Sequence, residues 1–177
     1  METFTAAGSY VRHMDTLLDR WQHAVTHAAS ELIALPDAAA SRRPAAGKWS
    51  VKEIIGHLID SAANNHRRFV EGQFQDTLTF PGYAQGAWVT SQDYQAASWP
   101  SLVALWAGYN DHLMHVVRSI PPAVLQQARA HNFDELGWRP LPRSQPATLQ
   151  YLIEDYVAHL EHHVAQARSL VRGPAAE

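Results

Sequence analysis

Apolar residues recur every three to four positions in four long stretches of the chain, a spacing typical of amphipathic helices. A capping box of Ser50 and Glu53 marks the start of the second helix, and the N-cap residue Thr148 marks the start of the fourth. Pro36 ends the first helix, and Gly173 ends the fourth. The predicted helices cover residues 8–33, 51–72, 98–119 and 149–171.

The connections between these helices differ in length. Residues 73–97 and 130–147 have no sustained apolar period and are predicted to be loops, the first with room for one helical turn. A short helical turn is expected over 122–129. Four amphipathic helices predict an all-α fold, a four-helix bundle, in a single domain covering residues 1–177. The loop 73–97 is long enough to cross the bundle, so neighbouring helices need not alternate in direction.

Size and charge exclude several classes of protein. A chain of 177 residues with 46% hydrophobic and 18% charged residues fills one core, which excludes a disordered chain or a coiled-coil rod. The formal charge of −3 leaves no excess of positive charge for nucleic acid or anionic lipid. No apolar run approaches membrane-spanning length, and residues 1–15 lack the pattern of a secretion signal. We therefore expect a cytoplasmic protein with no membrane or nucleic-acid partner.

Histidine is the residue type that points to chemistry. The absence of cysteine excludes disulfides, iron–sulfur clusters, thiolate zinc sites and a cysteine nucleophile. The chain holds 11 histidines, and two of them, His159 and His163, lie one turn apart at the edge of the apolar stripe of the fourth helix. His162 is predicted to face solvent. The second helix carries a polar stripe beside its apolar one, formed by His57, Ser61, Asn64 and Arg68.

These two polar edges can meet where the helices pack, so that His57, His159 and His163 close on one ion. Three neutral imidazoles with open positions left are typical of a catalytic metal site. A histidine at the edge of a helix stripe is, however, more often a hydrogen-bonded core residue than a ligand. His112 is the strongest rival or additional ligand, since it lies at the edge of the third helix's stripe. His23 and His27 have the same spacing but lie opposite their stripe, which indicates surface residues.

Two sequence blocks resemble the DinB-like superfamily, and within it the YfiT-type branch described as metal-dependent hydrolases. The first block is Trp49 to Phe69, WSVKEIIGHLIDSAANNHRRF, and the second is H-x-x-x-H followed by Gln, here His159, His163 and Gln166. The resemblance implies a bundle of up-down-down-up type whose metal is bound by His57, His159 and His163, the same three residues. Zinc, nickel, iron and manganese all suit imidazole ligands.

The resemblance implies a thiol-dependent transferase as the leading interpretation, because enzymes with a similar fold use small thiols. A divalent ion at the three histidines would activate a small thiol or water for attack on an electrophilic small molecule. A metal-dependent hydrolase is the alternative, and a non-enzymatic metal- or ligand-binding bundle is a third possibility. A pocket beside the metal lined by residues 73–97 favours an enzyme, whereas a metal sealed under that loop favours a binder. An exposed apolar edge favours a homodimer.

Other polar residues are assigned supporting roles. Ser61, Asn64 and Gln166 are predicted to orient ligands, water or substrate. Arg68 is predicted either to form a salt bridge at the rim of the bundle, the more common role of such an arginine, or to bind a carboxylate of substrate or cofactor. Asp60 is predicted at the surface or between helices, and Glu53 is a capping residue with a possible second role behind His57. Trp88 and Trp138 are the predicted aromatic walls of the pocket, because their loops lie near helix ends.

Overall fold

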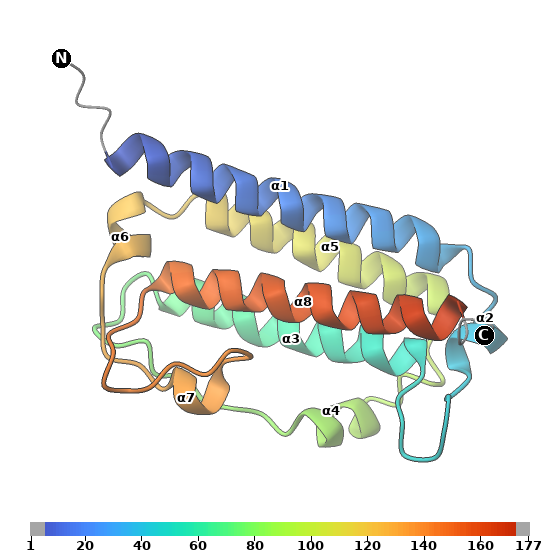
Figure 1. The fold of residues 1–177 in the computed structure, drawn as a ribbon. Coiled ribbons are helices and arrows are strands. Elements are labelled where there is room, and N and C mark those ends of the chain that lie inside the picture. Colours follow the sequence, from blue (N-terminus) through green and yellow to red (C-terminus); the bar gives the residue numbers. More distant parts are fainter. Residues whose placement is uncertain (1–5, 173–177) are drawn as a thin grey trace, which may run out of the picture.

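Four long helices form a bundle in the computed structural model, which describes residues 6–172 and their side chains from residue 12 onward (Figure 1). The long helices are α1 (Ala6–Ile33), α3 (Val51–Glu71), α5 (Trp99–Arg118) and α8 (Leu149–Arg172). The predicted four-helix bundle is therefore confirmed. The helix end predicted at Gly173 and both ends of the predicted 1–177 domain lie outside the described residues.

Four short helices lie in the connections. They are α2 (Asp37–Ser41), α4 (Gln85–Ser91), α6 (Pro122–Gln126) and α7 (Phe133–Leu136). Helices α4 and α6 occur where single helical turns were predicted. Helices α2 and α7 were not predicted, because five and four residues are too few to show a helical period. Between residues 6 and 172 the extended backbone forms only two isolated bridges, and no helix there is long and apolar enough to cross a membrane.

The helices run up, down, down and up. The ion pair Arg20–Glu161 joins the middles of α1 and α8, and Glu31–Arg168 joins their C-terminal ends, so these two helices are parallel. The Trp99 indole donates to the Leu32 carbonyl, which joins the start of α5 to the end of α1. Helices α3 and α5 therefore both run opposite to α1, as Figure 1 shows by their colours. The up-down-down-up topology implied by the resemblance is confirmed.

Local sequence signals set the helix starts. The Ser50 hydroxyl accepts a hydrogen bond from the Glu53 amide, and the Glu53 carboxylate accepts one from the Ser50 amide, which completes the capping box. The same carboxylate pairs with Arg43, and these contacts lower its pKa to about 2. The Thr148 hydroxyl accepts from the Tyr151 amide at 3.1 Å, as expected of an N-cap.

The core follows the predicted stripes except along α5. The stripes of α1, α3 and α8 are buried, with Trp21 at 0% exposure in the middle of α1. Leu105 was predicted to be buried but is 53% exposed, while Val103, Met114 and Val117 are buried instead. The physical reason is that α5 packs against both α1 and α3, so its buried surface is wider than one stripe and is centred elsewhere.

A long crossover connects α3 to α5, because two parallel helices can be joined only by a chain that returns along the bundle. The crossover includes α4 and is tied to α3 at Asp60, whose Oδ1 accepts from the Tyr94 hydroxyl at 2.7 Å and the Gln92 amide at 2.6 Å. Asp60 is 2% exposed, so of its two predicted placements the surface one was wrong, while it does make hydrogen bonds to a neighbouring segment: the crossover covers a face that α3 alone leaves open. Burial raises the pKa of Asp60.

Candidate metal centre

Three histidines from two antiparallel helices meet at one point. Potential ligand atoms of His57, His159 and His163 all lie within 4.8 Å of one another. The Nε2 atoms of His57 and His159 are 3.1 Å apart. The ring centre of His163 is 4.8 Å from that of His57 and 4.6 Å from that of His159. The three residues that the helical geometry singled out are thus the three that the fold brings together.

Burial keeps these imidazoles neutral. Desolvation, followed by the charge of His163, lowers the pKa of His57 to about 4. Desolvation and the neighbouring histidines lower the pKa of His159 to about 3, and desolvation also lowers the pKa of His163. Near neutral pH each ring therefore has a free lone pair, which is the form that binds a metal ion.

The donor set fits a divalent ion. Two nitrogens bound to one tetrahedral ion at about 2.0–2.1 Å are roughly 3.3 Å apart, close to the 3.1 Å between His57 and His159. The Nδ1 atom of His57 is buried without a hydrogen-bond partner, so the ring is positioned by packing, with the Trp49 ring centre 5.1 Å away. Glu53 does not support this ring, because its oxygens are taken by Arg43 and the cap.

Polar neighbours orient the other two rings. The Nδ1 atom of His163 lies 2.8 Å from Gln166 Oε1, a contact that fixes Nδ1 as the donor and leaves Nε2 free as a ligand. The Nδ1 atom of His159 lies 3.4 Å from the Ser61 hydroxyl. The predicted supporting position of Gln166 is therefore present, and Ser61 is a second such residue.

The remaining histidines lie elsewhere. His23 and His27 are exposed on α1, and His162 is exposed beside the cluster rather than in it. His112 was the strongest rival ligand, but its Nε2 atom lies 3.3 Å from that of His66 between α5 and α3, away from the cluster. His112 is therefore not a ligand of the cluster, because the face of α5 that carries it does not turn toward α8.

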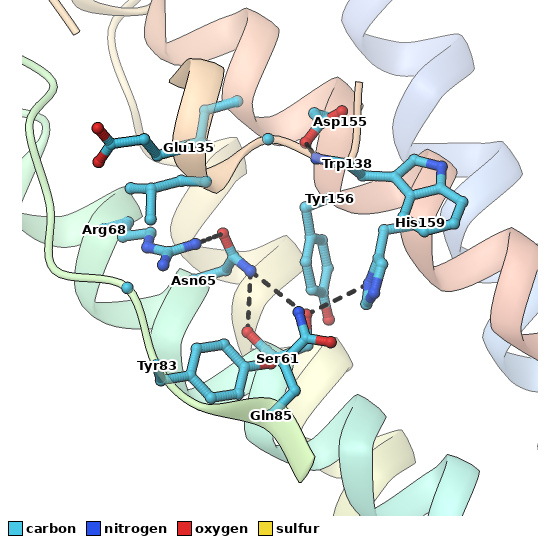
Figure 2. Close-up of a pocket in the computed structure, with 14 residues that line it drawn as sticks. Ser61, Asn65, Arg68, Tyr83, Gln85, Glu135, Trp138, Asp155, Tyr156 and His159 are labelled. Atoms are coloured by element: carbon cyan, nitrogen blue, oxygen red, sulfur yellow. Dashed lines mark hydrogen bonds between the residues drawn. The ribbon is translucent and has the colours of Figure 1, made fainter. Parts of the chain in front are cut away.

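A cavity of about 220 Å³ lies next to the cluster, with His159 in its wall (Figure 2). Its walls come from α3, α8, the crossover and the segment around α7. The lining residues are Ser61, Asn65, Arg68, Gly82, Tyr83, Gln85, Glu135, Leu136, Gly137, Trp138, Leu152, Asp155, Tyr156 and His159. Asp155 is an acidic residue inside the α8 stripe. Its carboxylate accepts hydrogen bonds from the backbone amides of Trp138 and Arg139 and so holds the α7 segment beside the pocket.

Several predicted pocket residues were placed correctly and two were not. Trp138 lines the cavity, and its ring centre lies 5.4 Å from that of His159. Trp88 is 39% exposed and packs against Tyr83, outside the cavity, because α4 turns it outward. Asn64 bonds back to the Asp60 carbonyl, and Asn65 faces the pocket in its place. His57, Ser61 and Arg68 of the predicted polar stripe do lie at the cluster or the cavity, so Asn64 is the one member of the stripe that was misplaced.

Comparison with known proteins assigns the chain to a family. Residues 17–167 match the DinB superfamily, and the chain belongs to it. Two relatives carry the name "putative metal-dependent hydrolase": one from Bacillus mycoides (strain KBAB4), 27% identical over 124 residues, and YfiT of Bacillus subtilis (strain 168), 24% identical over 126 residues. These alignments cover 70% and 71% of this chain but only 65% and 66% of the relatives, just under two thirds of their length.

A solved structure has the same fold. The structure of Bacillus subtilis YfiT, described as an unusual four-helix bundle topology, matches with a TM-score of 0.74 at 20% identity. The match covers 97% of this chain and 90% of that one. The bundle and its topology are therefore shared, while identity this low carries the fold alone.

Proposed function

We propose that the protein is a metal-dependent hydrolase of an electrophilic small molecule, with one divalent ion held by His57, His159 and His163. The observation that carries the proposal is the convergence of three imidazoles, one of which, His159, lies in the wall of a cavity. Zinc, nickel, iron and manganese suit the donor set. Such an ion supplies an open position at which water or a small thiol is acidified, and it polarises the substrate.

The residues of the chain prepare this site in two ways. Ser61 and Gln166 hold the Nδ1 sides of His159 and His163, so their other ring nitrogens point to the shared centre. Trp138 packs across the rings and shields them from bulk water.

The position of the cavity favours an enzyme over a metal-storing bundle. Gly82, Tyr83 and Gln85 of the crossover line the cavity next to His159. A cavity of a size suited to a small molecule therefore lies beside the three histidines, which favours an enzyme. The two named relatives favour hydrolysis, whereas the transferase predicted from the sequence differs only in using a low-molecular-weight thiol in place of water.

Metal analysis and a substrate panel test the proposal. Protein purified without a polyhistidine tag is expected to contain about one divalent ion per chain, and chelation is expected to remove turnover of activated esters and amides. Turnover that requires an added thiol assigns the transferase reaction instead. His159→Ala is expected to lose both the ion and the turnover, with His162→Ala as the matched control. Full metal content in His159→Ala would overturn the assignment of the site.

A further inference from the structure

Arg68 brings a buried positive charge into the cavity, and no ion pair to it is found among the described residues. Its side chain comes from α3 and is 7% exposed, and burial lowers its pKa. It donates to Asn65 Oδ1 at 3.4 Å and to the Pro81 carbonyl at 3.2 Å, and no carboxylate of the described residues lies within ion-pair distance. A guanidinium has five N–H donors, so donors remain for a ligand. A buried charge without a counter-ion is costly, and a bound anion would remove that cost.

The two acidic residues of the cavity are matched to other arginines. Asp155 accepts from the amides of Trp138 and Arg139 and pairs with the Arg139 side chain at 3.3 Å. Glu135 pairs with Arg143 outside the cavity. Both carboxylates are therefore paired with other arginines, and the charge of Asp155 acts on Arg68 only from beyond ion-pair distance. Figure 2 shows Arg68 pointing to Asn65 on the cavity wall.

A row of polar groups leads from Arg68 to the candidate metal centre. Asn65 bridges to the Ser61 hydroxyl at 3.4 Å, and that hydroxyl lies 3.4 Å from His159 Nδ1 (Figure 2). Ser61 and Arg68 are seven residues apart on one face of α3, about 10 Å along the helix axis. A molecule whose anionic end contacts Arg68 therefore places its other end near the three histidines.

We propose that the cavity is a carboxylate subsite and that its ligand is a small molecule with one carboxylate about 10 Å or less from the bond that reacts. The planar guanidinium matches a carboxylate through two parallel hydrogen bonds. Asp155 and Glu135 nearby disfavour a doubly charged phosphate. Assigning this ligand as the substrate rests on the proposed function, whereas the carboxylate subsite itself does not.

Calorimetric titration with hexanoate and its uncharged analogue hexanamide tests the subsite. Hexanoate is expected to bind at least tenfold more tightly, both with chelator present, so that it cannot ligate a metal, and with metal loaded. Inorganic phosphate is titrated as a doubly charged comparison ligand and is expected to bind more weakly than hexanoate. Arg68→Gln is expected to remove the preference for hexanoate, and Arg68→Lys to retain part of it because the charge stays.

Arg67→Gln is the matched control, because Arg67 is the exposed neighbour that pairs with Glu71 on the helix surface. It should keep the full preference. Equal binding of hexanoate and hexanamide by the unmodified protein would overturn the proposal, and this comparison does not depend on whether the Arg68 variants fold. Metal content measured on the same samples separates the proposed metal-dependent function from the proposed carboxylate subsite. Loss of the metal site should leave the preference for hexanoate in place.

Discussion

The Nε2 atoms of His57 and His159 lie 3.1 Å apart although 102 positions separate them in the chain. The contact exists because α3 and α8 pack antiparallel with their polar edges turned to the same side. Removing one partner should therefore separate metal binding from folding. His159→Ala is expected to lower metal affinity about a hundredfold or more and leave the helical content unchanged, since the apolar stripes stabilise the bundle.

Metal titration and circular dichroism measure the two effects. His162→Ala is the control, because that side chain is exposed and packs only against Trp138 and His163. It should keep metal affinity and helix content. An unfolded His159→Ala protein would assign a structural role to the metal.

Stability of the metal-free protein should fall with decreasing pH between about 6.5 and about 4. The unfolded chain takes up a proton at His57 near its ordinary value of 6.5, whereas burial holds the folded pKa at about 4. The unfolded state therefore binds more protons in this window, and His57 alone lowers the stability by roughly 3 kcal/mol across it. Urea unfolding at several pH values measures the slope. His57→Gln should make the slope shallower but not remove it, because burial also lowers the pKa values of His159 and His163. His23→Gln, on the exposed face of α1, should leave the slope as it is, and an unchanged slope in His57→Gln would contradict the burial argument.

Gln166→Ala should weaken metal binding by about tenfold while keeping one ion per chain. The variant loses the acceptor that holds His163 Nδ1, so the ring rotates more freely and the other nitrogen is no longer fixed toward the cluster. Competition titration with a chelator gives the affinity. Gln150→Ala is a suitable comparison, because Gln150 contacts only Glu154 on the same helix. The same affinity in both variants would show that the contact with His163 does not orient the ligand.

Gly56→Ala should destabilise the protein by about 1–3 kcal/mol. A Cβ atom at this position would lie 2.1 Å from the Tyr94 ring, which the hydrogen bond to Asp60 holds in place. Gly108→Ala is the matched control: it lies in α5 with no atom within 4 Å of an added Cβ and should gain up to about 1 kcal/mol. Urea denaturation compares the two, and a stable Gly56→Ala protein would mean that the crossover is free to move from α3.

The helices and the ligand set could be predicted because each depends on short-range periodicity. The capping box at Ser50 and the four-residue spacing of His159 and His163 are visible in the sequence and place side chains on a known helix face. Helix geometry also indicated that His57 lies on the matching edge. The pairing of α3 with α8 was the remaining step, and the resemblance to the DinB-like superfamily implied it.

The cavity could not be predicted in the same way, because irregular segments build much of it. Asp60 looked exposed on α3 taken alone, and only the crossover, which has no period, shows that it is buried. Asn64 and Asn65 are neighbours on one helix, so the choice between them depends on which side the crossover covers. Leu105 is exposed because two helices pack on α5, and the spacing of apolar residues in α5 does not show how many helices pack on it.

The parallel arrangement of α3 and α5 has a consequence for how such proteins diverge. The chain must return the length of a 21-residue helix, about 30 Å, before α5 can begin, and this return passes beside the three histidines. The topology thus brings an irregular surface segment next to a site held on two packed helices. Insertions or substitutions between α3 and α5 can reshape the cavity while the histidines stay on two packed helices. Selection can in this way change the molecule that is bound without rebuilding the metal site.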